Sequence, residues 1–218
     1  MARGEPEFYV YALTDTGLPE TLRVQSRTLR TLRVGSVLVI GDRRRERTSP
    51  TAEALQHQHA VVAALMDRTD ALLPARFGSS LGEASLRETI AKREASLVEA
   101  LALVRGRRQM TIRVFGEREA ADAGADHRLS GTEYLKGLQA RAHHVPPEVT
   151  AIRRAIGGLA AAERVEPGER GLRVTVFHLV ATRDLAAYGD RAGRLDLLPH
   201  QARVSGPWAP FAFAPDLF

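Results

Sequence analysis

The order of strand-like and helix-like segments in the second half of the chain constrains the fold most strongly. Residues 110–115 alternate apolar and polar side chains, which is the pattern of a half-buried strand. Residues 164–166 and 172–180 are rich in β-branched and aromatic residues and flank the turn pair Pro167-Gly168, so they predict a hairpin. Residues 195–204 predict a last extended segment.

Helix signals fall between these strands. Ser130 and Glu133 have the spacing of a capping box and predict a helix to about residue 141, which Pro146-Pro147 restarts. Thr182 can cap a short helix over residues 185–188. One apolar stripe at helical spacing contains Val149, Ile152, Ile156 and Leu159. The resulting order is β-α-β-β-α-β, the split βαβ pattern of ferredoxin-like folds.

The first half predicts a small sheet and two helices. Residues 8–13 predict a strand, and the strands 32–34 and 37–40 are joined by a tight turn at Gly35-Ser36. Ser49-Pro50 is a helix start, so a helix is predicted from there to residue 68, with Leu55, Val62, Leu65 and Met66 on its apolar face. A single longer helix is predicted from residue 83 to the stop signal at Gly106, with an apolar face of Leu86, Ile90, Leu97, Leu101 and Val104.

These patterns predict an α+β protein with two domains. The first is a small α+β domain over residues 1–105. The second is a ferredoxin-like βαββαβ domain with an extended proline and aromatic tail, over residues 106–218.

Composition excludes several kinds of chemistry. The 218 residues include no cysteine, so disulfides, thiolate nucleophiles and cysteine-ligated zinc are all excluded. The chain has no run of 18 or more apolar residues, and its first residues lack the apolar core of a secretory signal. We therefore expect a cytoplasmic location.

The net charge of +5 and the pI of about 10.2 raise the question of nucleic-acid binding. The most basic run, residues 43–47, lies between the turn residues Gly41-Asp42 and Thr48-Ser49-Pro50, which favours a solvated loop. No aromatic residues alternate with it as they do where bases stack. We expect no nucleic-acid partner, and a regulatory or nucleic-acid-binding module is the alternative.

The sharpest catalytic signal is residues 78–82, Gly-Ser-Ser-Leu-Gly, which match the spacing of a nucleophile elbow around Ser80. Asp196 and His200 follow in the order that a serine hydrolase needs. The elbow also needs a parallel sheet and an oxyanion segment, and neither is visible. His57 and His59 are two residues apart and turn to different faces of a helix, and His143-His144 lie at a helix break. We therefore expect no enzyme, no catalytic or metal-binding residue, and no cofactor.

The tail, residues 206–215, contains the only tryptophan and three prolines. Proline fixes an extended backbone and removes hydrogen-bond donors, so this segment cannot be a helix. Its aromatic side chains either dock on the protein's own surface or are offered to a partner, and docking on the protein is expected because an exposed apolar tail favours aggregation.

Together these segments resemble the gas vesicle L/F (GvpL/GvpF) family over nearly the whole chain. The two most specific segments are residues 72–78 (Leu-Leu-Pro-Ala-Arg-Phe-Gly) and 206–213 (Gly-Pro-Trp-Ala-Pro-Phe-Ala-Phe). The others are 9–13 (Tyr-Val-Tyr-Ala-Leu), 59–66 (His-Ala-Val-Val-Ala-Ala-Leu-Met), 111–114 (Thr-Ile-Arg-Val) and 130–135 (Ser-Gly-Thr-Glu-Tyr-Leu). The tail departs from the family's usual Pro-Pro-Tyr-Ser-Phe-like ending, so both an L-like and an F-like role stay open.

The resemblance implies a role in gas vesicle assembly through contact with the small hydrophobic shell protein and with other accessory proteins. It implies no nucleic acid and no membrane lipid as partner. The residues expected to bind the partner are Arg76 and Phe77 in the first specific segment and Trp208 and Phe211 in the tail. In this hypothesis Arg76 pairs with acidic groups on the shell protein while Phe77 packs inward; the alternative is that Arg76 pairs within its own chain, across the two domains.

Overall fold

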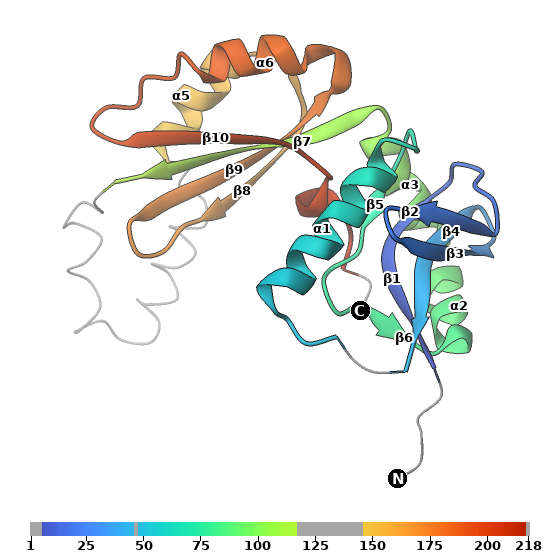
Figure 1. Ribbon diagram of the computed structural model, residues 1–218. Helices are drawn as coiled ribbons and strands as arrows, with labels where there is room; N and C mark the ends of the chain where they lie inside the picture. Colours follow the sequence, from blue (N-terminus) through green and yellow to red (C-terminus); the bar gives the residue numbers. More distant parts are fainter. Residues whose placement is uncertain (1–5, 46–47, 117–145, 217–218) are drawn as a thin grey trace, which may run out of the picture. The chain divides into compact units, whose positions relative to one another are not determined.

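The computed structural model describes residues 6–45, 48–116 and 146–216, and the chain divides into two units (Figure 1). The first unit contains Met1–Gln109 together with Pro207–Phe218, and the second contains Met110–Gly206. The tail was expected to belong to the second domain and instead belongs to the first unit. The reason is that the buried side chain of Ala209 is part of the first unit's hydrophobic core.

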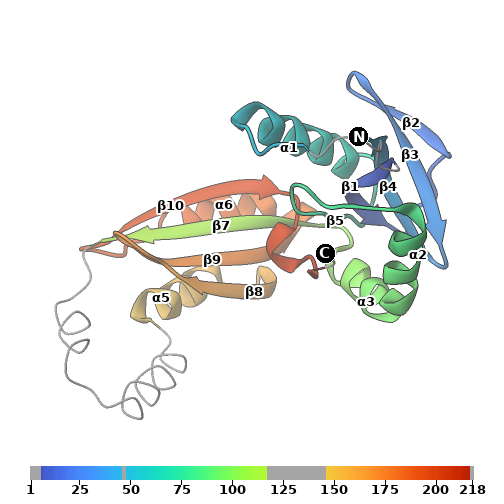
Figure 2. The ribbon, with the colours of Figure 1, turned by 90° about the horizontal axis from the view of Figure 1, so that it is seen from below.

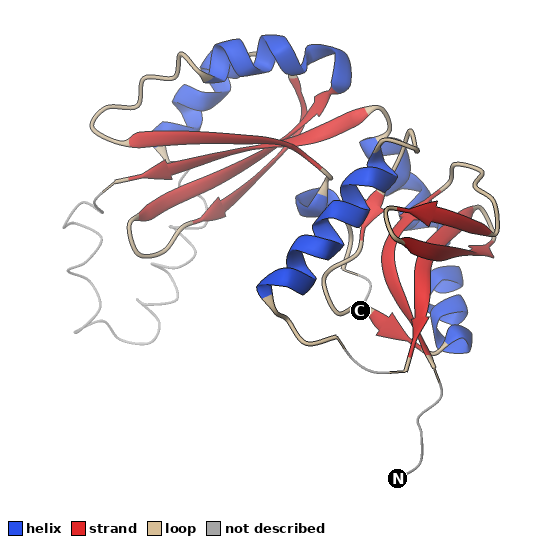
Figure 3. Ribbon diagram, viewed as in Figure 1, coloured by secondary structure: helices blue, strands red, loops and turns tan. Residues whose placement is uncertain are grey.

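The first unit is built on an antiparallel sheet with the order β2-β3-β4-β1-β5, and β6 also pairs with β1 (Figures 1 and 3). The strands are β1 (Glu7–Thr14), β2 (Thr21–Val24), β3 (Arg27–Val34), β4 (Val37–Arg44), β5 (Leu73–Pro74) and β6 (Ser80–Leu81). The basic run predicted to be a loop begins inside this sheet, because Arg43 and Arg44 are the last residues of β4 and pair with β1.

Strand β1 is buried on both faces from Phe8 to Thr14. Helix α1 (Ala52–Met66) covers one face of the sheet, and helices α2 (Glu83–Lys92) and α3 (Glu94–Val104) cover the other (Figures 1 and 3). A strand covered on both faces is apolar throughout, which explains the continuous run of apolar and aromatic residues in β1.

Helix α1 differs from its sequence-based prediction at its first turn. Its N-cap is Thr51 rather than Ser49, and the Thr51 hydroxyl accepts a hydrogen bond of 3.2 Å from the Ala54 amide. Leu55 was predicted to lie on the apolar face but is 46% exposed, whereas Gln58 is buried in that face. The buried amide of Gln58 has specific hydrogen-bond partners, described below, and these make its burial possible.

The single long helix predicted from residue 83 is two helices. The backbone leaves the helical conformation at Arg93 (φ −112°, ψ 8°). The Glu94 carboxylate, at the start of α3, accepts hydrogen bonds of 2.7 Å from both the amide and the hydroxyl of Ser36, in the turn between β3 and β4. The apolar residues keep their helical spacing on both sides of Arg93, so the sequence pattern did not indicate the break.

The second unit has the element order β7 (Arg107–Phe115), α5 (Pro147–Ile156), β8 (Ala160–Pro167), β9 (Leu172–Ala181), α6 (Leu185–Ala192) and β10 (Gln201–Trp208). Its four strands are ordered β10-β7-β9-β8, and α5 and α6 lie on the same face of the sheet (Figures 1 and 2). The predicted stripe residues Val149, Ile152 and Ile156 are buried against Val174 and Val176 of β9.

Some sequence-based predictions fall on residues that the structure does not describe. The helix predicted from Ser130 and Glu133, and the pair His143-His144, lie outside the described residues. Among the helices of the described ranges, none is long and apolar enough to cross a membrane.

A polar cluster lies inside the second unit's core. His178 is 1% exposed, and its Nδ1 lies 2.7 Å from the Tyr188 hydroxyl while its Nε2 lies 3.1 Å from Glu163 Oε2. Glu163 also accepts hydrogen bonds from the Arg153 guanidinium. Burial lowers the pKa of His178 below its ordinary value of 6.5, although the Glu163 carboxylate opposes that shift.

We expect Gly35→Ala to destabilise the protein by about 1–2 kcal/mol. Gly35 has a positive φ of 56°, and a Cβ atom there would clash with the Glu94 carboxylate. The change is checked by thermal unfolding followed by circular dichroism. Gly17→Ala is the matched control, because a Cβ at Gly17 meets no atom within 4 Å. Equal melting temperatures for the two variants would contradict the proposed role of the turn.

We expect His178 to titrate below pH 6.5, because burial favours its neutral form. The unfolded chain then binds more protons than the folded one as the pH falls below 6.5, so this residue's contribution to stability is present above that pH and is lost below it. Ring-proton NMR shifts of His178 over a pH series measure the titration, and urea unfolding over the same series measures the stability. A His178 ring that titrates at or above pH 6.5 would contradict the prediction that burial lowers its pKa.

Candidate partner-binding surface

The segment Pro74-Ala-Arg-Phe-Gly78, one of the two most specific parts of the sequence, is held against β1 as a short edge strand and turn. Leu73 and Pro74 pair with Leu13 and Ala12 of β1, and the Ala75 amide donates to the Tyr11 carbonyl at 2.9 Å. Gly78 has φ +84°, a conformation that glycine adopts without steric cost, and it allows the chain to turn into β6. We call residues 74–78 the PARF loop.

A buried polar network fixes the PARF loop from inside the first unit. The Tyr9 hydroxyl donates a hydrogen bond to Gln58 Oε1, and Gln58 Nε2 donates to the Ala75 carbonyl at 3.0 Å. The Gly78 amide donates to the same Tyr9 hydroxyl at 3.3 Å. Burial raises the pKa of Tyr9, although the Gly78 amide and Arg44 oppose that shift, so the hydroxyl keeps its proton. The network joins β1, α1 and the loop.

The C-terminal tail docks on the same unit. Ala209 is 3% exposed, and the Ala212 amide donates to the side-chain oxygen of Gln109 at 2.8 Å. The last described residue, Asp216, accepts a hydrogen bond from Arg93 through its backbone carbonyl and forms an ion pair of 2.7 Å with Arg76 through its side chain. The tail therefore contacts both the first unit's core and the PARF loop.

The four residues predicted to bind the partner all lie in the first unit, in three places. Arg76 and Phe211 line one small cavity of about 90 Å³, together with Pro215 and Asp216 of the tail. Phe77 is half-buried, with its ring edge-on to Tyr9 at 6.4 Å between centroids, which is the inward packing expected of it. Trp208 contacts His59 of α1, with 5.3 Å between ring centroids.

Three of these side chains leave surface for a partner. Trp208 is 37% exposed and Phe211 is 38% exposed, so each offers part of an aromatic ring to solvent. The ion pair of Arg76 with Asp216 is exposed at both side chains, at 74% and 65%. Arg76 does pair within its own chain, but with the tail of the same unit and not across two domains. An ion pair this exposed contributes only about 0–1 kcal/mol to stability.

Sequence reasoning missed Gln58 and Arg44. Arg44 was assigned to a loop, but its side chain is only 16% exposed, and its guanidinium stacks on the Tyr9 ring with Cζ 3.7 Å from the ring centroid. It donates hydrogen bonds to Asp42, Thr48 and the Tyr11 hydroxyl. The only sign of these two residues in the sequence was the apolar strand that contains Tyr9 and Tyr11. A buried tyrosine needs a polar partner for its hydroxyl, and Gln58 and Arg44 are those partners.

The setting of Ser80 differs from the one that a nucleophile elbow needs. Ser80 lies in the short strand β6, which pairs antiparallel with β1, so the parallel sheet of a nucleophile elbow is absent around it. His200 belongs to the second unit and lies 3.3 Å from Glu148 of α5. Within the described ranges, no three His, Asp or Glu side chains gather in a way that could hold a metal ion.

Comparison with known proteins agrees with the fold. A family model described as "Gas vesicle synthesis protein GvpL/GvpF" matches residues 7–215. The structure is similar to the crystal structure of the gas vesicle protein GvpF from Anabaena sp. PCC7120, with a TM-score of 0.71 and 17% identity over 97% of this chain and 99% of that one. It is also similar to GvpF from Microcystis aeruginosa, with a TM-score of 0.72 and 16% identity over 96% of this chain and 99% of that one.

A search of curated protein sequences found no match. The family model nevertheless covers almost the whole chain, including the PARF loop and the tail. The two crystal structures share the fold of this chain over nearly its whole length. This protein is therefore a member of the gas vesicle GvpL/GvpF family.

Proposed function

We propose that this protein binds the small hydrophobic shell protein of the gas vesicle during nucleation and assembly of the vesicle, and that it catalyses no reaction. The observation that carries the proposal is the docked tail, which holds Trp208 and Phe211 partly exposed and places Phe211 in one cavity with Arg76. Aromatic side chains and arginine are the residues that contribute most to protein–protein binding.

Docking on the first unit prepares the tail for binding. Its backbone is already ordered by the bond from Ala212 to Gln109 and by the buried Ala209, so binding costs little conformational entropy there. The shell protein must remain apolar for its own assembly, and partly exposed aromatic rings offer a complementary surface. Other accessory proteins of the vesicle are further partners in this proposal, and the site of action is the cytoplasm, at the vesicle.

The second unit is proposed to be a ferredoxin-like domain. Support comes from its β-α-β-β-α-β element order and its strand order β10-β7-β9-β8. In this proposal the first unit and its tail carry the shell-binding surface, without nucleic acid or membrane lipid as partner.

We expect the double variant Trp208→Ala, Phe211→Ala to capture at least about tenfold less shell protein than the wild type, because aromatic residues at interface centres each contribute more than about 1 kcal/mol. The measurement is a pull-down of the major shell protein co-expressed with the tagged full-length chain, at physiological salt. Leu103→Ala is the control, because Leu103 is an apolar residue of α3 that is 40% exposed and does not line the cavity of Phe211 and Arg76.

Equal loss of capture in the control and in the double variant would mean that the tail is not the binding surface. Failure of the wild-type chain to capture shell protein, with salt-dependent retention on RNA or heparin instead, would favour the nucleic-acid alternative.

Arg76 and Asp216 give a second prediction, in which two variants that break the same ion pair have opposite effects. Arg76→Ala is expected to weaken capture, because it removes the cation that would meet a shell carboxylate. Asp216→Asn is expected to strengthen capture by up to about fivefold, because it frees Arg76 from an exposed pair worth about 0–1 kcal/mol. The same pull-down, titrated with shell protein, measures both. If both variants weaken capture equally, Arg76 acts only by holding the tail in place.

A further inference from the structure

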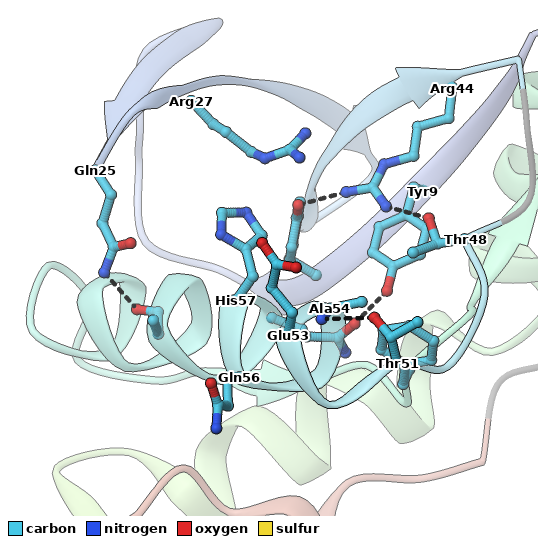
Figure 4. Close-up of a pocket in the computed structure, with 14 residues that line it drawn as sticks. Tyr9, Gln25, Arg27, Arg44, Thr48, Thr51, Glu53, Ala54, Gln56 and His57 are labelled. Atoms are coloured by element: carbon cyan, nitrogen blue, oxygen red, sulfur yellow. Dashed lines mark hydrogen bonds between the residues drawn. The ribbon is translucent and has the colours of Figure 1, made fainter.

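A second cavity in the first unit, of about 560 Å³, is lined by Phe77 of the PARF loop but by no residue of the tail (Figure 4). The strands of the sheet contribute Arg27 of β3, Arg44 of β4, and Tyr9 and Tyr11 of β1 to its lining. Its helix side includes Glu53 and His57 of α1. Figure 4 shows that Glu53 and His57 rise from α1 toward the strands that carry the two arginines.

Arg44 is a fixed part of the cavity wall. It is bonded to Asp42, Thr48 and the Tyr11 hydroxyl, and its flat face lies on the Tyr9 ring. The hydrogen bond and charge of Asp42 outweigh the effect of burial, so the pKa of Arg44 is raised and the group stays charged. Arg44 therefore supplies a permanent positive charge but has little donor capacity left for a ligand.

Arg27 differs because most of its side-chain donors have no partner among the described residues. Nη1 donates to Asp42 at 3.1 Å, and the side chain is 45% exposed. A guanidinium has five N–H donors, and within the described residues the bond to Asp42 is the only side-chain hydrogen bond of Arg27. The planar fork that remains has the geometry that binds a carboxylate through two parallel hydrogen bonds.

His57 supplies the second unmet group. Its Nε2 is buried and has no hydrogen-bond partner among the described residues, an arrangement that costs free energy unless a ligand or water meets it. Burial lowers the pKa of His57, and the positive charges of Arg27 and Arg44 lower it further, against the opposing effect of Asp42 and Glu53. These effects favour a neutral imidazole, and an anion placed between Arg27 and His57 would favour the protonated form.

The charges around the cavity indicate what kind of anion fits. Arg27 and Arg44 are balanced by Asp42 and Glu53, so the one positive charge that the site can add for an anion is a proton on His57. One added charge matches a monoanion and not a dianion such as a phosphate monoester. A single negative charge can pair with Arg27 and draw a proton onto His57. We propose that this cavity binds one carboxylate group, held by the free fork of Arg27 and by Nε2 of His57. The proposal does not depend on shell-protein binding.

The test uses two probes that differ in the source of the carboxylate. One is sodium acetate, and the other is the blocked tripeptide acetyl-Ala-Glu-Ala-amide, with acetyl-Ala-Gln-Ala-amide as its uncharged match. Ring-proton NMR shifts of His57 in the full-length chain are followed as each probe is added and as the pH is changed. We expect the glutamate peptide to shift the His57 resonances saturably and to raise the pH at which the ring titrates, while the glutamine peptide does neither.

Variants locate the site. Arg27→Gln is expected to weaken peptide binding by at least about tenfold, because it removes a charge-assisted pair. Arg27→Lys keeps the charge without the fork and should restore part of the affinity. Arg30→Gln on the same strand is the control, because Arg30 is exposed and does not line the cavity.

The two probes distinguish the source of the carboxylate, and three results would overturn the proposal. Saturable binding of acetate as well as peptide supports a site for free carboxylates, and binding of the peptide alone supports a site for an acidic side chain of a partner protein. Equal binding of the glutamate and glutamine peptides, an unchanged His57 titration, or equal affinity in Arg27→Gln and Arg30→Gln would overturn the proposal.

Discussion

The hydrogen-bonded chain from Tyr9 through Gln58 to the Ala75 carbonyl is the interaction on which the position of the PARF loop in the first unit depends. Each of these groups is buried, and a buried polar group left without a partner costs about 1–3 kcal/mol. The three groups come from β1, α1 and the PARF loop, so satisfying them fixes the position of the loop relative to both elements. Phe77 and Arg44 both pack against the Tyr9 ring. Tyr9 therefore holds the PARF loop in place and also lines the 560 Å³ cavity.

Local patterns in the sequence were enough to predict most elements of the fold. The apolar run of β1, the turn at Gly35, the hairpin around Gly168 and the stripe of Val149, Ile152 and Ile156 each follow from spacing alone, and all of them are present. Docking of the tail was also expected, because an exposed apolar tail favours aggregation. The family followed from short segments in a fixed order, of which the PARF loop and the tail are the most specific.

The wrong or missing predictions share a physical cause, which is contact between residues far apart in the sequence. The break between α2 and α3 depends on Glu94 meeting Ser36, and the burial of Gln58 depends on Tyr9 and Ala75. The run at Arg43 looks like a solvated loop because its neighbours are turn residues, but β1 pairs with it. The tail was assigned to the second domain because sequence order placed it after β10, whereas Ala209 is buried in the core of the first unit. Among the candidate site residues, sequence supplied Arg76, Phe77, Trp208 and Phe211, but it gave no sign that Asp216 would be the partner of Arg76.

The first unit thus presents two surfaces of different chemistry. The tail and the PARF loop offer partly exposed aromatic rings beside an exposed ion pair, which suits an apolar protein partner with some acidic groups. The cavity lined by β1, β3, β4 and α1 is polar and balanced in charge, and one guanidinium fork and one imidazole nitrogen there have no partner among the described residues. The first surface depends on the tail being docked, whereas the second is built entirely from residues 9–77.

Amide hydrogen exchange of the full-length chain is the most direct test that the tail is part of the first unit. The informative group is the amide of Ala212, which donates to the side chain of Gln109. If the tail is docked as described, exchange at Ala212 is far slower than in an unstructured peptide, and Gln109→Ala speeds it while leaving the Ala75 amide in the PARF loop protected. Exchange at Ala212 at the rate of an unstructured peptide in the wild-type protein would contradict the docked tail, and with it the surface that the tail forms with Arg76.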